Sequence, residues 1–160
     1  MTQVLVLVLA LLIGVVAGSR ALTAPAVVAW GAMLGWIDVA DKWSEWMAHP
    51  ITVTVLTIFA LGELVTDQLP MTPSRKVPPQ FIARLITGGF SGAVIGSAFF
   101  HTFSATGAGV VGAVLGTLAG AELRSRFAGA KGGNDRPGAF TEDALAVGGG
   151  VLVAFLVSLV

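Results

Sequence analysis

The sequence predicts an all-α fold, a single bundle of about six helical segments embedded in a membrane. Hydrophobic residues make up 55% of the 160 residues and charged residues only 11%, whereas about a quarter of the residues in a soluble domain are charged. The apolar residues form runs near the 20 or so residues that cross a bilayer. Glycine recurs at four-residue spacing within these runs, which is typical of closely packed membrane helices. We therefore expect one transmembrane domain over residues 1–160.

Six apolar runs are predicted to be helical, and prolines at or just before several run starts agree with this, since a first-turn proline costs little. The second run is short for a span, so whether it crosses the membrane stays open. The first run has no basic residue ahead of it, so we expect no cleaved signal peptide. The predicted segments are 4–18, 24–37, 51–69, 79–103, 107–127 and 140–160.

The basic residues mark one side of the predicted bundle. If all six segments cross, Lys42 is alone on one side and the other eight Lys and Arg residues lie in or near the three links on the opposite side. Basic links mark the cytoplasmic face, so links 70–78 and 128–138 are predicted to be cytoplasmic. The segment 36–46, with three tryptophans, is predicted to be an interfacial loop on the outer face.

An internal repeat is a further prediction. A shift of 59 residues aligns residues from 51–102 with 110–160 and places Glu63 on Glu122, Pro78 on Pro137 and Phe81 on Phe140. Each unit holds an even number of helices, so both copies have the same orientation, as in transporters with parallel repeats. The alternative is that two apolar hairpins align by chance.

Glycines four residues apart lie on one helix face and let two backbones approach closely. The pattern predicts tight helix packing, within one chain or between copies, and we expect a homo-oligomer. The glycines concerned are Gly14, Gly18, Gly31, Gly35, Gly88, Gly92, Gly96, Gly112, Gly116, Gly120, Gly148, Gly149 and Gly150.

Charged residues form a layer near the predicted cytoplasmic ends of the helices. Charges inside a span are costly, so they face the bundle, pair, and often mark a pathway. One interpretation is a site for a small ion or solute, and the other is a network that only locks helix ends together. The layer consists of Arg20, Glu63, Asp67, Arg84, Glu122 and Asp143. Judged only by the predicted depth of each residue in the membrane, Arg84 can reach Glu63, Glu122 or Asp143.

The stretch from Gly18 to Pro25 suggests an interrupted helix, and a plain hairpin turn predicts the same residues. The two histidines, His49 and His101, lack the spacing of a metal site, and there are no cysteines. Hydrolase and phosphate-loop motifs are absent. We expect no metal, no cofactor, no nucleic-acid partner and no enzymatic activity.

The stretches 18–25, 61–75, 120–124 and 142–150 together resemble bacterial membrane proteins grouped as domain of unknown function 4126. The first reads GSRALTAP and the second begins LGELVTDQLP. The resemblance covers most of the chain and implies a bacterial inner-membrane location. It implies no activity, substrate or catalytic residue.

The leading hypothesis is a small transporter or channel with its charged site in the cytoplasmic half, and a dimer would help to build a path. The first alternative is a structural or assembly protein whose charges only pair helices. The second is a protein that binds anionic membrane lipids through basic residues of the links, namely Arg75, Lys76, Arg124, Arg126, Lys131 and Arg136.

Overall fold

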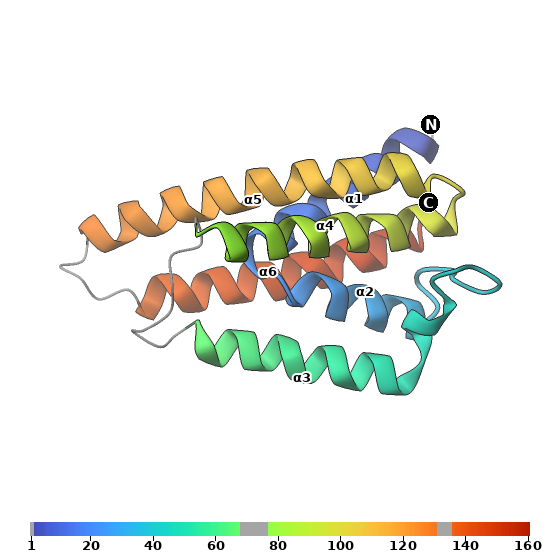
Figure 1. Ribbon diagram of the computed structural model, residues 1–160, viewed down its shortest axis with the longest axis horizontal. Coiled ribbons are helices and arrows are strands. Elements are labelled where there is room, and N and C mark those ends of the chain that lie inside the picture. Colours follow the sequence, from blue (N-terminus) through green and yellow to red (C-terminus); the bar gives the residue numbers. More distant parts are fainter. Residues whose placement is uncertain (1, 68–76, 131–135) are drawn as a thin grey trace.

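The computed structural model describes residues 2–67, 77–130 and 136–160, and it confirms the all-α prediction. The described chain forms six α-helices and one short 3-10 helix along the long axis of the molecule (Figure 1). Both chain ends lie at the same end of the bundle. The elements are α1 (Thr2–Ser19), α2 (Thr23–Met33), η1 (Glu45–Ala48), α3 (Pro50–Thr66), α4 (Pro78–Ala98), α5 (Thr102–Ala130) and α6 (Arg136–Val157).

Four helices are long and apolar enough to cross a membrane, namely Thr2–Ser19, Pro78–Ala98, Thr102–Leu123 and Phe140–Val157. The helices α2 and α3 are shorter, and the 11 residues of α2 extend only about 16 Å at 1.5 Å per residue. The predicted fourth segment ran too far, because α4 ends at Ala98 and a turn separates it from α5. Phe100 in this turn has a φ of 61°, a left-handed conformation that ends a helix.

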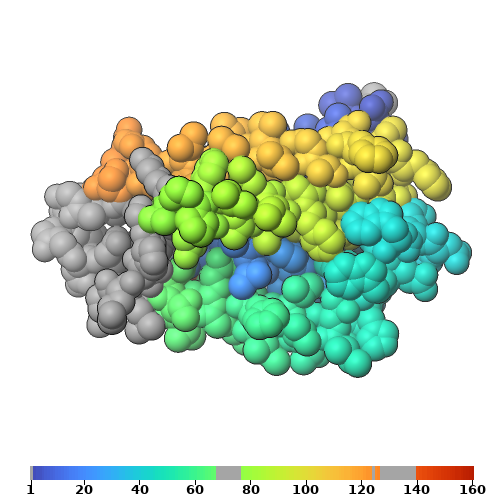
Figure 2. Space-filling model, viewed as in Figure 1, coloured from blue at the N-terminus to red at the C-terminus, as the bar shows by residue number. Residues whose placement is uncertain are grey.

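The helices α1, α4 and α5 form the tightly packed part of the bundle, and α2 and α6 pack against them. The helix α3 lies at one edge and packs mainly on α2 and η1. The space-filling view shows α3 along the margin of an elongated body (Figure 2). The end of α3 that carries charge therefore depends on few helix contacts for its position.

Glycines explain why α1, α4 and α5 pack so closely. A Cβ added at Gly112 of α5 would lie 2.9 Å from the carbonyl carbon of Leu11 and 3.0 Å from the Cα of Gly14. One added at Gly88 of α4 would lie 2.7 Å from the Cβ of Ala113. Backbones at this separation have no room for side chains, and such contact stabilises helices in lipid, where apolar burial drives association only weakly. The same close approach holds at Gly14, Gly18, Gly92, Gly96, Gly109 and Gly116.

Three of the glycines predicted to pack do not do so in the described structure. Gly35 lies beyond the end of α2 with a φ of 75°, so it serves a turn. Added Cβ atoms at Gly35, Gly148 and Gly149 would meet no atom within 4 Å. Gly148 and Gly149 lie on α6 away from its packed face, whereas a Cβ added at Gly150 would lie 3.3 Å from the Val27 side chain. Gly31 has side-chain neighbours from 3.1 Å, and Gly120 is buried.

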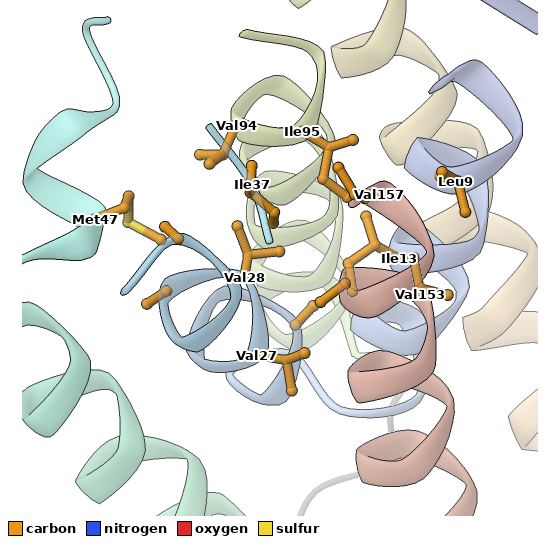
Figure 3. Close-up of a cluster of buried hydrophobic side chains, with 14 of the residues drawn as sticks. Leu9, Ile13, Val27, Val28, Ile37, Met47, Val94, Ile95, Val153 and Val157 are labelled. Carbon is orange, nitrogen blue, oxygen red and sulfur yellow. The ribbon is translucent and has the colours of Figure 1, made fainter. Parts of the chain in front are cut away.

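A hydrophobic cluster joins α1, α2, α4 and α6. Figure 3 shows Ile13 of α1 and Val28 of α2 among side chains from α4 and α6. Ile37 and Met47, from the segment between α2 and α3, close one end of it and are buried. This cluster fixes α2 against the body of the bundle, and α3 in turn packs on α2.

The segment between α2 and α3 forms a folded cap over the end of the bundle that carries few basic residues. Ser44 and Ser97 form a buried hydrogen bond of 2.7 Å between this cap and α4. Trp43 and Trp46 are half-exposed and lie 6.0 and 5.8 Å from the Phe90 ring. Trp36 is in edge contact with Phe155 of α6.

Candidate functional site

The buried charges gather at the break between α1 and α2. The chain leaves α1 at Ser19 and restarts as a helix at Thr23. Such a break frees carbonyl groups at the end of one helix and N–H groups at the start of the next. In an apolar interior these groups need partners, since each one left unbonded is costly. Side chains from α3, α4 and α6 lie at this break, and we call Arg20, Glu63, Asp67, Arg84 and Asp143 the charge cluster.

Arg20 is the centre of the charge cluster. Its side chain is fully buried, with one terminal nitrogen donating to a carboxylate oxygen of Asp67 and the other to one of Asp143. Asp67 directly follows α3, and Asp143 lies in the second turn of α6. The guanidinium thus joins two helices, α3 and α6, that pack little on each other. Charge-assisted bonds of this kind are among the strongest that side chains make.

Glu63 of α3 satisfies the start of α2. Its two carboxylate oxygens accept hydrogen bonds from the backbone N–H groups of Ala21 and Leu22, each at 2.8 Å. The N-cap residue of α2, Leu22, has no capping side chain of its own. A carboxylate at this place also interacts favourably with the positive end of the helix dipole. Glu63 is therefore an N-cap supplied by a distant helix.

Arg84 of α4 satisfies the end of α1. Its Nη1 donates to the carbonyl oxygen of Gly18 and, at 2.8 Å, to that of Ser19. The Thr117 hydroxyl of α5 lies 3.3 Å from the same Gly18 carbonyl. A guanidinium here also matches the negative end of the α1 dipole. Arg84 is 1% exposed, so these bonds lie in the interior of the protein.

The structure brings five of the six predicted site residues to this break, but not Glu122. Glu122 lies on the exposed surface of α5 and accepts a 2.9 Å hydrogen bond from the Nε of Arg126, one turn on. Its place in the aligned repeat matched Glu63, yet the two carboxylates have different surroundings. Hydropathy predicted a similar depth in the membrane for both glutamates. The rotation of each helix about its axis decides which carboxylate faces the break, and only that of Glu63 does.

The predicted lipid-headgroup residues fall largely outside the described part of the chain. Arg75, Lys76 and Lys131 lie beyond it, as do the side chains of Arg124 and Arg136. Arg126 is exposed beside Glu122. Among the described residues, no group of three or more His, Asp or Glu side chains could hold a metal ion.

Buried polar atoms without a hydrogen-bond partner within the described residues also occur near the break. Two of them are the Nε of Arg20 and the hydroxyl of Thr23. Sequence reasoning missed Thr23 and Thr117, because a threonine in an apolar helix gives no signal of its own. The only hint was position, since Thr23 follows the predicted interruption.

A bundle of apolar helices around a layer of buried, paired charge fits a polytopic α-helical membrane protein. The chain belongs to the family named Domain of unknown function (DUF4126), whose model matches residues 7–160. No curated protein and no solved structure matches the chain.

Proposed function

We propose that this protein is a small membrane transporter or channel for an ion or small solute, and that Arg20, Asp67 and Asp143 form its binding site. The observation that carries the proposal is the full burial of the Arg20 charge between carboxylates from two different helices. Ionisable groups inside a membrane protein are expensive, and they commonly mark an ion or proton pathway.

The geometry supports an exchange of partners at Arg20. A small anion would compete with the two carboxylates for the guanidinium, and a proton or cation would compete with the guanidinium for the carboxylates. Either event weakens the bonds that join α3 to α6. Because α3 packs mainly on α2 and η1, its charged end is the part of the bundle with the most freedom to move when those bonds open.

Flux into proteoliposomes tests the proposal. Vesicles loaded with a pH-sensitive dye are exposed to proton, potassium, chloride and acetate gradients. We expect flux of at least one of these ions, and we expect Asp67→Asn together with Asp143→Asn to abolish it. The matched control is Glu122→Gln, which removes an exposed carboxylate outside the charge cluster. Unchanged flux in a correctly folded Asp67→Asn, Asp143→Asn protein would overturn the assignment.

The proposed location is a bacterial inner membrane, with the charge cluster toward the cytoplasm. Support comes from the basic residues near the α3–α4 and α5–α6 links, opposite the cap that holds Lys42. The chain has no cysteine, so Lys42→Cys and Arg126→Cys each introduce a unique thiol. A membrane-impermeant thiol reagent added to intact cells should label Cys at 42 and spare Cys at 126. The reverse pattern would refute the orientation.

A structural function is the second candidate, and a specific observation favours it. Glu63 and Arg84 cap the two helix ends at the break, a role that needs no ligand. On this alternative, neutralising the charge cluster lowers the thermal unfolding temperature, and no ion flux is found in the wild-type protein.

Binding of anionic lipid through the basic links is a third candidate, supported by the number of basic residues near those links. Co-purifying anionic lipid that is lost when Arg126 and its basic neighbours are neutralised would support it.

A homo-oligomer is proposed with the transport function, because a few helices leave little room for a path within one chain. Its size is measurable by native mass spectrometry.

A further inference from the structure

An apolar groove runs along α2, with α3 forming one wall and α6 the other. Its volume is about 350 Å³. It extends from Thr23, the first residue of α2, to Leu34 and Trp36 just beyond the last. A helix segment of that length spans about 16 Å, which suits one alkyl chain of medium length. The α3 wall includes Thr57, Ala60, Leu61 and Leu64, and the α6 wall includes Val147 and Val151.

The polar side-chain groups of the lining are the hydroxyls of two threonines and the indole N–H groups of Trp30 and Trp36. Thr57 is satisfied, since its hydroxyl donates to the Val53 carbonyl at 2.6 Å and accepts from Trp30 at 2.9 Å. Thr23 is different, because its hydroxyl is buried and has no partner within the described residues. The Thr23 end of the groove therefore holds a buried hydroxyl without a partner within the described residues.

Residues of the charge cluster lie about one helical turn beyond that end of the groove. Asp67 follows the lining residue Leu64 by three positions, and Asp143 precedes the lining residue Val147 by four. Residues three or four apart lie one helical turn from each other on one face. Arg20 lies in the break between α1 and α2, three residues before Thr23. Its Nε is a second buried donor without a partner within the described residues. Three elements thus bring charged groups to the same end of the groove.

We propose that the groove is a specific site for one ester-linked acyl chain of a membrane glycerolipid. The hydrocarbon lies along α2 between α3 and α6, and the ester carbonyl accepts hydrogen bonds from the Thr23 hydroxyl and the Arg20 Nε. The ion exchange proposed above uses the two terminal nitrogens of Arg20, whereas the lipid contacts use its Nε and the Thr23 hydroxyl. Lipid binding and transport can therefore be tested separately.

The charges at this end of the groove favour a neutral hydrogen-bond acceptor, such as an ester carbonyl, over an anionic group. Arg20 with Asp67 and Asp143 carries a net charge of −1, and adding Glu63 and Arg84 leaves that sum unchanged. While both carboxylates stay bound to Arg20, a further anion at this end of the groove is disfavoured, whereas the Thr23 hydroxyl and the Arg20 Nε can each donate a hydrogen bond to a carbonyl oxygen. The location fits as well, because the charge cluster lies at helix ends, where the ester groups of a lipid leaflet meet its hydrocarbon.

Native mass spectrometry of the detergent-purified protein tests the proposal with two probes of equal chain length, a diester and a diether phosphatidylcholine. The diether lacks only the carbonyl oxygens. We expect one tightly retained diester and binding of the diether that is weaker by about tenfold or more, because one of the two lost hydrogen bonds comes from a charged group. Equal retention of the two lipids would overturn the proposed role of the carbonyl.

Three variants locate the site. Ala60→Phe fills the groove from α3 and should remove the retained lipid, whereas Ala119→Phe places the same side chain on an exposed position of α5 and should not. Thr23→Val keeps the shape of the side chain and removes one of the two donors, so it should narrow the difference between diester and diether affinities. If Ala60→Phe misfolds, Val147→Phe fills the groove from the α6 wall.

A fluorescence measurement gives an independent readout. Trp30 and Trp36 line the groove, so with Trp43 and Trp46 replaced by Phe, a brominated diester lipid should quench the remaining fluorescence saturably. Unlabelled diester should reverse this quenching. Quenching that rises in proportion to lipid content and survives Ala60→Phe would show ordinary contact with bulk lipid and refute the site. Preferential displacement by a free fatty acid would also refute it, since the occupant would then be an acid.

Discussion

Arg20 and Asp143 are 123 positions apart in the chain, yet the buried guanidinium of one donates directly to the carboxylate of the other. The same guanidinium binds Asp67 at the end of α3. One side chain at the break between α1 and α2 thus contacts both the residue that follows α3 and a residue of α6. The consequences for stability, dynamics and packing can be measured.

Replacing Arg20 by Met should destabilise the protein by about 3 kcal/mol, because it leaves two largely buried carboxylates without their counter-ion. The measurement is thermal or chemical unfolding in detergent. Adding Asp67→Asn and Asp143→Asn to Arg20→Met should recover much of the loss, since the unpaired charges are then gone. A triple variant no more stable than Arg20→Met would contradict this account.

Replacing Glu63 by Ala should release the start of α2. Two charge-assisted hydrogen bonds are lost, each of a kind that contributes about 1.5–3 kcal/mol. We expect a lower unfolding temperature and faster hydrogen exchange at the amides of Ala21 and Leu22, which donate to Glu63. Glu122→Ala is the matched control, because Glu122 is exposed, and exchange at the break should not change in it.

Gly112→Ala should disrupt the contact between α1 and α5. The added methyl group would overlap the Leu11 carbonyl oxygen and lie 2.9 Å from the carbonyl carbon, and overpacking of this kind costs about 1–3 kcal/mol. Gly148→Ala introduces the same group where nothing lies within 4 Å, so alanine's higher helix propensity, about 1 kcal/mol over glycine, should leave stability equal or higher. Equal losses of stability in both variants would contradict the described packing.

Amides of α3 should exchange faster than those of α1 in the detergent-solubilised protein. The helix α3 packs mainly on α2 and η1, whereas α1 contacts α4, α5 and α6 closely, and weakly packed elements open locally at lower free energy. Hydrogen-exchange mass spectrometry measures both helices in one sample. Asp67→Asn should increase exchange at the end of α3, and equal protection of α1 and α3 would refute the prediction.

The sequence by itself determined the fold class and the identity of most groups at the site. Hydropathy and proline placement located six helices to within a few residues, because both act within one helix or at its ends. Burial cost alone marked Arg20, Glu63 and Arg84 as inward-facing, and the structure places all three at the break.

Only the tertiary structure decided which partners these groups have. Arg84 was expected to reach carboxylates by depth, but it also caps carbonyl oxygens at the end of α1, whose need for donors arises only where the helix is interrupted. Glu63 and Glu122 share depth and spacing in the sequence, and the rotation of α3 and α5 separates them into a partly buried cap and a surface pair. Partner choice depends on how helices far apart in the chain are rotated and placed against each other. Local patterns of hydropathy and charge do not contain that information.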